Sequence, residues 1–205
     1  MTVSPEDRAT WVRHSWRLAL VAALVHAAQF VGCALLWRET GSAVLAAFGL
    51  DAVVGACGAL RLGLGIRAAG EIPPQRASRV LGYGYAAAAV LTLLIAVPQL
   101  WRGFRPAISP AGIVLAAVSM LVIPIVGSYM KSLAVELRSQ PFRSAAVFTF
   151  GNSYLSLVLL TALLLNAGMD LGWGDAAGAV AMVPFMAHKS VQILLEEERP
   201  KFVEE

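Results

Sequence analysis

The hydrophobic positions of this chain form six long runs separated by short polar segments, and this pattern predicts six membrane-spanning helices. Each run has about 20 mostly apolar residues, the length that an α-helix needs to cross the hydrocarbon core of a bilayer. We place the helices at 18–37, 42–62, 80–101, 111–130, 144–167 and 175–195, with a break at Pro98 and a kink at Pro124. The expected fold is an all-α, six-helix transmembrane bundle, with a single domain at 18–195 between polar segments at 1–17 and 196–205.

Composition supports a membrane protein and excludes an ordinary soluble domain. Only 14% of the 205 residues are charged and 58% are hydrophobic, whereas about a quarter of the residues in soluble domains are charged. Because the first apolar run is a full-length span and five more follow, we interpret it as a retained helix and not a cleaved signal peptide.

The distribution of basic residues predicts the orientation. Thirteen of the sixteen Lys and Arg residues flank one side of the predicted bundle, and only Arg38, Arg102 and Arg105 flank the other. The positive-inside rule then places both termini in the cytoplasm of a multi-pass protein of the cell membrane. These basic residues are expected to contact lipid head groups and not nucleic acid. His188 and Lys189 belong to this group, with Lys189 snorkelling at the cytoplasmic end of the last helix.

A few polar side chains inside the predicted helices are candidates for chemistry, and Asp51 is the foremost. It is the only carboxylate in the apolar segment 41–58, and an intramembrane carboxylate usually faces the bundle interior and marks a functional site. His26 and Gln29 share one face of the first helix with Phe30 and Cys33, and Asn152 in the fifth helix must hydrogen-bond inside the bundle. We predict catalytic roles for Asp51, His26 and Asn152.

Aromatic side chains on these helices are candidates for contacts with a substrate, although such a stripe is more often packing. We expect Phe148 and Asn152 on one face of the fifth helix, and Phe150 and Tyr154 on another. Tyr83 and Tyr85 suit interface anchors at the start of the third helix. The predicted substrate-binding set is Gln29, Phe30, Tyr85, Phe148, Phe150 and Tyr154.

Three further side chains are assigned structural roles. Asp175 opens the last helix, where a carboxylate complements the helix dipole. The cysteines, Cys33 and Cys57, lie within the first two helices, and neither their spacing nor their surroundings indicate a metal site or a redox pair. We interpret both as small apolar packing residues.

Several segments resemble the transmembrane domain of the cation diffusion facilitator superfamily, in its short branch without a C-terminal domain. The resemblance covers about residues 15 to 195, and its most specific parts are the FGLD segment ending at Asp51 and the pattern of Trp173, Asp175 and Ala179. It implies a six-helix bundle with a mid-membrane metal site between the second and fifth helices. It also implies a dimer, although the small-residue faces could pack within one chain just as well.

The chain departs from this family at most of its expected metal ligands. Members of that branch carry carboxylates at five positions where this chain has Gln29, Gly55, Ile95, Ala145 and Phe148. A divalent cation near the bilayer centre needs about four ligands with enough charge to offset dehydration. We therefore predict neither a resident metal nor a cofactor.

Three functions remain open at this stage. The first is a membrane-embedded enzyme that cyclises an apolar isoprenoid-type substrate without metal, as small integral-membrane terpene cyclases do. Asp51, kept protonated by its apolar surroundings, would donate the initiating proton, aromatic faces would stabilise the cation, and His26 or Asn152 would orient the acid. The second is a proton-coupled exporter of a divalent cation such as zinc, with Asp51 as the surviving ligand. The third is a non-catalytic partner subunit.

Overall fold

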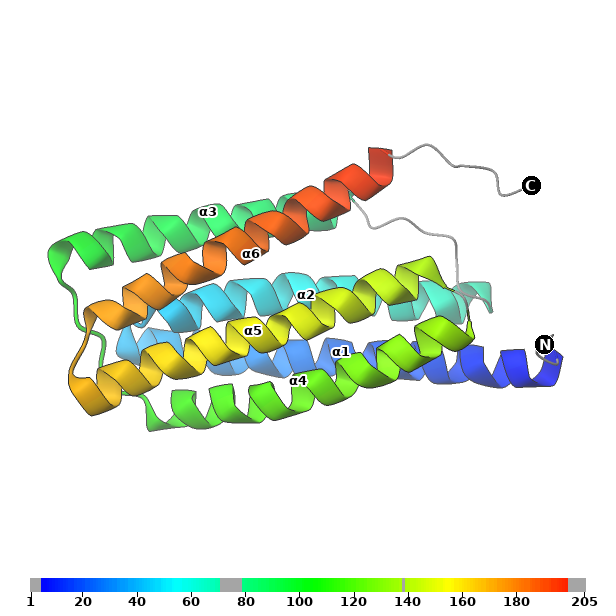
Figure 1. Cartoon of the computed structure of the whole chain (residues 1–205), viewed down its shortest axis with the longest axis horizontal. Coiled ribbons are helices and arrows are strands. Elements are labelled where there is room, and N and C mark those ends of the chain that lie inside the picture. Colours follow the sequence, from blue (N-terminus) through cyan, green and yellow to red (C-terminus); the bar gives the residue numbers. More distant parts are fainter. Residues whose placement is uncertain (1–4, 71–78, 138, 199–205) are drawn as a thin grey trace.

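In the computed structural model the chain folds into six long helices (Figure 1). The structure describes residues 5–70, 79–137 and 139–198, and no strand occurs in these ranges. Expectations about Pro73, Pro74, Arg76, Arg138, Arg199, Lys201 and the side chain of Arg8 lie outside the described residues. The helices are α1 (Pro5–Thr40), α2 (Ala43–Ala69), α3 (Arg79–Arg102), α4 (Pro110–Glu136), α5 (Gln140–Met169) and α6 (Trp173–Glu198).

All six helices contain a span long and apolar enough to cross a membrane, which confirms the predicted six-helix membrane bundle. The largest boundary difference is at α1, which begins at Pro5 and so absorbs most of the polar segment 1–17. Its 36 residues exceed the roughly 20 that the hydrocarbon core requires. The polar residues at its N-terminal end are therefore expected to extend beyond the hydrocarbon core.

Side-chain caps explain where several helices start. Ser42, Ser109 and Ser139 each accept a hydrogen bond from the backbone N–H three residues later, which satisfies one of the amides that a helix start leaves without a partner. Pro98 does not break the third helix as expected, since α3 continues through it to Arg102. Membrane helices tolerate proline because neighbouring groups satisfy the freed backbone carbonyl.

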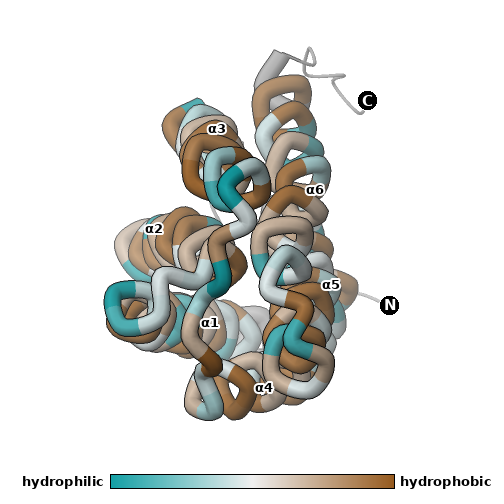
Figure 2. Tube along the Cα trace, turned by 90° about the vertical axis from the view of Figure 1, so that its left-hand side faces the viewer, coloured by the Kyte–Doolittle hydropathy of each residue, from teal (hydrophilic) through white to brown (hydrophobic). Residues whose placement is uncertain are grey.

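The helices pack in three close pairs, α1 with α2, α4 with α5, and α3 with α6. In the view along the bundle, α1, α2, α4 and α5 form one group, and α3 and α6 lie together on one side of it (Figure 2). Helix α2 contacts α1, α3, α5 and α6. Because α5 also packs against α6, helices α2 and α5 together join the four-helix group to the α3/α6 pair.

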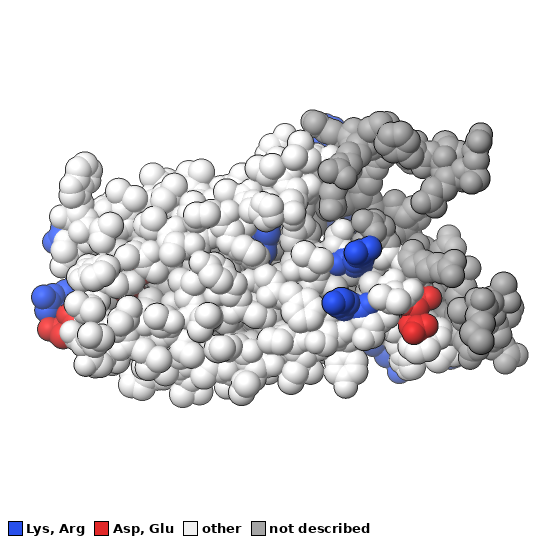
Figure 3. Space-filling model, viewed as in Figure 1, with Lys and Arg blue, Asp and Glu red and all other residues white. Residues whose placement is uncertain are grey.

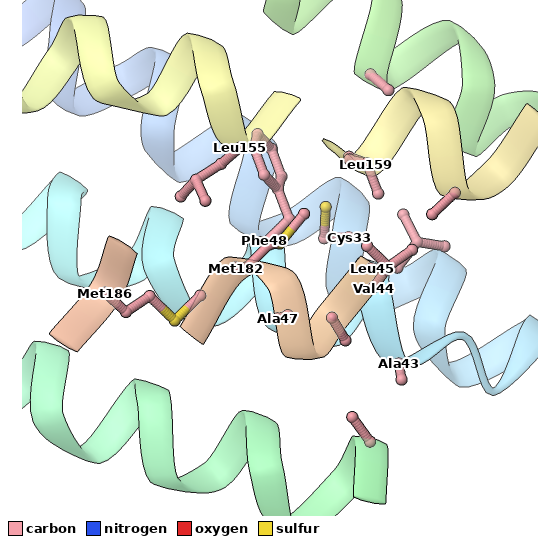
Figure 4. Close-up of a cluster of buried hydrophobic side chains, with 14 of the residues drawn as sticks. Cys33, Ala43, Val44, Leu45, Ala47, Phe48, Leu155, Leu159, Met182 and Met186 are labelled. Carbon is pink, nitrogen blue, oxygen red and sulfur yellow. The ribbon is translucent and has the colours of Figure 1, made fainter. Parts of the chain in front are cut away.

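Two buried apolar clusters stabilise the bundle. The cluster toward the end where α1 ends and α6 begins, which we call the outer cluster, includes Cys33, Phe48, Leu155 and Met182 (Figure 4). The inner cluster, toward the end where α1 begins and α6 ends, includes Val12, Ile66, Met130, Leu133 and Phe142.

Along several helices, buried polar residues stand between members of the two clusters. On α1, His26 and Gln29 lie between Ala22 of the inner cluster and Cys33 of the outer cluster. On α5, Asn152 lies between Ala146 and Leu155 in the same way. On the face shown in Figure 3, most charged side chains lie toward the two ends of the bundle, and the stretch between them is mainly uncharged. His26, Gln29 and Asn152 thus lie between the two clusters, whereas other buried polar residues, such as Ser42 and Asp175, lie near the starts of α2 and α6.

Candidate functional site: a buried ion pair at the junction of three helices

The most unusual feature of the interior is an ion pair between α2 and α6. Lys189 Nζ donates to Asp51 Oδ1 over 2.8 Å, and the two side chains are only 1% and 2% exposed. The sequence suggested an Asp51 side chain without a charged partner, and the structure shows that Asp51 is paired with a lysine. A buried charge is costly unless it is paired and hydrogen-bonded, and here each charge has the other as its partner.

The Lys189 ammonium has three further neighbours, Asn152, Tyr85 and Phe185. Together with Asp51 they form what we call the ammonium cage. Asn152 Oδ1 on α5 accepts a second hydrogen bond from Nζ. The ring centroids of Tyr85 on α3 and Phe185 on α6 lie 4.8 and 4.9 Å from Nζ, within cation–π range. One ammonium thus contacts residues of α2, α3, α5 and its own helix.

The prediction that Lys189 snorkels at the cytoplasmic end of the last helix is wrong, and the pattern of α6 explains why. Met182, Met186 and Ile193 are buried at helical spacing, and Lys189 falls on the same stripe. His188, one position earlier, is exposed. The direction of the helix face, and not the distance from the helix end, decides where Lys189 points.

A second group of polar residues, which we call the His26 chain, links α1 to α4. Gln29 Nε2 donates to Ser119 Oγ over 2.9 Å, so the Gln29 Oε1 atom, 3.0 Å from His26 Nδ1, accepts the proton on that nitrogen. This network leaves Nε2 as the proton-accepting nitrogen of the neutral ring.

The His26 ring packs against α2 at Gly55. A Cβ atom at Gly55, one turn after Asp51, would lie 3.4 Å from His26 Cδ2. The ring therefore lies across Gly55, next to the ammonium cage. His26, Asp51 and Asn152, the three predicted catalytic residues, are all buried in this region, although the hydrogen bond of His26 runs to Gln29 and not to Asp51.

The six predicted substrate-binding residues do not gather around one space. Gln29 belongs to the His26 chain and Tyr85 to the ammonium cage. Phe30 and Tyr154 are 37% and 49% exposed on the outer surface. The Phe150 ring lies where a Cβ at Gly127 of α4 would meet it, and Phe148 is half-buried.

The sequence did not predict that Phe185 and Lys189 belong to the site. The position of the Phe185 ring is determined by the close approach of α5 and α6 at Gly151. A Cβ atom at Gly151 would lie 1.9 Å from Phe185 Cζ, so the ring occupies the space that any side chain at position 151 would need. The Phe185 ring also lies 6.0 Å from the Tyr154 ring. Gly151 thus lets α5 and α6 approach and directs the ring toward the ammonium.

Asp175 has a different partner from the one expected. It lies in the first turn of α6, but its carboxylate is directed at the start of α2. It accepts from Ser42 Oγ over 2.5 Å and from the Ala43 and Val44 amides over 2.6 and 3.3 Å. Asp175 therefore caps α2 and fastens α6 to it.

Two observations limit the ligands that the interior could hold. The described residues contain no group of three or more His, Cys, Asp or Glu side chains placed to bind a metal ion. A groove of about 370 Å³ runs between α5 and α6, but its walls include Val158, Ala162 and Gly178 and none of the predicted site residues. The Asp51 region therefore offers a single carboxylate, an amide oxygen and two aromatic faces.

No family model matches this chain, and no curated protein matches it either.

Proposed function

We propose that this protein is a proton-coupled cation transporter in which the ion pair of Asp51 and Lys189 is the coupling site. The observation that carries the proposal is the full enclosure of both charges at the junction of α2, α5 and α6. Ionisable residues inside a membrane bundle are expensive, and they typically mark ion pathways and proton relays. The resemblance to cation diffusion facilitators points in the same direction.

The pair supports coupling because the site stays neutral in two alternative states. In one state Asp51 is balanced by the Lys189 ammonium. In the other, a transported cation of charge +1 takes the place of the ammonium, and Lys189 releases one proton and becomes a neutral amine. Both states avoid an unbalanced buried charge, so binding one such cation is linked to the release of one proton.

A lysine suits this role better than an arginine would. The lysine amine loses its proton readily when buried, whereas an arginine guanidinium stays charged in proteins. His26 packs against α2 at Gly55, one turn after Asp51, and an imidazole can both accept and donate a proton. We assign to His26 the transfer of the proton between Lys189 and water.

The cyclase hypothesis requires a different protonation state and a different environment for Asp51. Acid initiation needs a protonated carboxyl facing an apolar substrate, whereas the Asp51 carboxylate accepts a hydrogen bond from an ammonium. Two of the proposed aromatic contacts, Phe30 and Tyr154, lie on the outer surface. The geometry therefore favours transport.

Proton flux in reconstituted liposomes tests the proposal. Liposomes with a trapped pH-sensitive dye would receive inward gradients of monovalent, divalent and organic cations in turn. We expect one class of cation to drive proton movement in the wild type. Asp51→Asn should abolish this flux, and so should Lys189→Arg, which keeps the positive charge but does not release a proton.

Asp170→Asn is the matched control, because it also removes the carboxylate of an ion pair, but an exposed one with Arg105. Its flux should equal that of the wild type. If no cation drives a flux that depends on Asp51, the protein is not a transporter of this kind. A role as a partner subunit would then be favoured.

A further inference from the structure

We infer that the transported cation is a small primary ammonium ion, which displaces the Lys189 ammonium from the ammonium cage. This inference rests on the proposed function and names the substrate class of the same site. The cage already binds an ammonium group, because the head group of Lys189 is chemically a primary alkylammonium.

The four contacts around Nζ are those that recognise an ammonium. Asp51 Oδ1 supplies the opposite charge at 2.8 Å, and Asn152 Oδ1 accepts a second N–H. The rings of Tyr85 and Phe185 face Nζ at 4.8 and 4.9 Å. Carboxylate, amide oxygen and aromatic faces together favour a cation that donates hydrogen bonds and is weakly enough hydrated to enter an aromatic site.

The same contacts suit a divalent metal ion poorly. Zinc is bound by about four nitrogen, sulfur or carboxylate ligands, and calcium by six to eight oxygens. The cage has one carboxylate, and the described residues contain no group of three metal-type ligands. Replacing one +1 ammonium with another +1 ammonium also keeps the charge of the site constant, which a dication would not do.

The exchange balances in atoms and charge. The entering ammonium forms hydrogen bonds to Asp51 and Asn152, Lys189 Nζ gives up both, and one proton leaves Lys189 for water. No covalent bond other than this N–H breaks. Because the tethered lysine competes at a high effective concentration, the wild type should bind its substrate weakly, as a transporter that must release it requires.

Calorimetric titration of the purified protein with n-propylammonium chloride tests the inference. Titrations in buffers of different ionisation enthalpy report the number of protons released per cation bound. We expect saturable binding with about one proton released in the wild type and no binding to Asp51→Asn. Asp170→Asn should behave as the wild type does.

Lys189→Ala provides a second, independent reading. Alanine keeps Cβ, so the missing part of the side chain corresponds to n-propylammonium. This variant should bind the ion at least about tenfold more tightly than the wild type, because the tethered competitor is gone. Its binding should release no proton, and the ion should raise its unfolding temperature.

The outcomes separate the two proposals. Binding with proton release that is lost in Asp51→Asn supports the inference, and binding without proton release overturns the displacement step. If n-propylammonium does not bind while a sodium gradient drives Asp51-dependent proton flux, the substrate class is wrong and the transport function stands. If neither occurs, both proposals fail.

Discussion

Among the basic side chains that the structure describes, Lys189 differs from the rest in being enclosed, at 1% exposure. Removing two charges from water costs several kcal/mol per ion. The attraction between the two charges offsets this cost only when the geometry is good. In this bundle the Lys189 ammonium is stabilised by Asp51, by Asn152 and by two ring faces. The pair is therefore specific to this arrangement and sensitive to the loss of either member.

The first prediction concerns the stability of single and double variants of the pair. Asp51→Asn or Lys189→Met alone leaves a buried charge without its partner, and each should lower the free energy of unfolding by about 3–5 kcal/mol. The double variant Asp51→Asn/Lys189→Met removes both charges and should recover most of that loss. Unfolding in mixed micelles during a detergent titration measures these differences.

The exposed pair of Arg105 and Asp170 provides the control, since exposed ion pairs contribute only about 0–1 kcal/mol. Asp170→Asn should therefore change the free energy of unfolding by less than that amount. A double variant as unstable as the worse single variant would contradict the account, because the loss would then not come from an unpaired charge.

The second prediction tests the close approach that directs Phe185 toward the ammonium. Gly151→Ala places a methyl group 1.9 Å from Phe185 Cζ, so the ring must move or the helices must separate. Overpacking of this kind costs about 1–3 kcal/mol. We expect that loss in the detergent titration, together with weaker cation-driven proton flux.

Gly168→Ala is the matched control in the same helix, because no other atom lies within 4 Å of a Cβ placed there. Alanine has a higher helix propensity than glycine, so this variant should be neutral or slightly more stable. Equal effects of the two substitutions would mean that the contact with Phe185 contributes nothing.

These residues also show which parts of the site the sequence could predict. Asp51 and Asn152 were predictable because a polar group inside a membrane span needs a partner. Lys189 was also within reach, since Met182, Met186 and Ile193 place it on the buried stripe of α6. The contact of Phe185 with Gly151 was not, because it depends on how closely α5 and α6 approach, and the helix pattern does not contain that distance.

At the scale of the helices, polar contacts hold α6 to its neighbours at two places, one near its start and one in its second half. Near its start, Asp175 accepts from Ser42 and two amides of α2. Further along, Lys189 contacts α2 and α5, and Ser190 Oγ donates to the Gly82 carbonyl of α3. Under the proposed mechanism a substrate replaces the contacts at Lys189, so Asp175 is expected to serve as the permanent attachment.

The third prediction tests this division of roles. Asp175→Ala leaves the Ser42 hydroxyl and the Ala43 amide without their buried acceptor, and an unsatisfied buried group costs about 1–3 kcal/mol. Ser42→Ala should cost less, and the two losses should not add, because both residues belong to one network. Unfolding of the two single variants and of the double variant gives the coupling energy.

Transport measurements complete that test. Any flux that remains in folded Asp175→Ala should keep the cation selectivity of the wild type, since Asp175 does not belong to the ammonium cage. A change in selectivity would place Asp175 in the substrate site and contradict its role as a cap of α2.

The helix positions were largely predictable from the hydrophobic pattern, and the helix ends were not. Observed helices extend beyond the predicted spans because serine caps and polar turns continue the helix past the apolar run, as Ser139 does at the start of α5. The pattern also did not reveal that α3 and α6 form one pair. Helix pairing depends on which faces fit together, and small residues occur on several faces of this chain.

At the scale of the whole molecule, the arrangement of charges predicts the orientation in the membrane. The end where α1 begins and α6 ends carries most of the basic residues, among them Arg61, Arg67 and Lys131. The burial of Lys189 removes one charge from that side, but the asymmetry remains large. Charges near helix ends determine topology during insertion, so we expect this end to lie in the cytoplasm.

The fourth prediction tests the orientation with single cysteines and a membrane-impermeant maleimide. Cys57 is exposed and is first replaced by alanine, whereas Cys33 is fully buried and should not react. Ala107→Cys, between α3 and α4, and Glu136→Cys, at the end of α4, place an exposed thiol at opposite ends of the bundle. In intact cells Ala107→Cys should be labelled and Glu136→Cys should not, and opening the membrane should expose both. The reverse pattern would place the basic end outside the cell. Labelling of the parent that retains only Cys33 would show that the bundle interior is open to water.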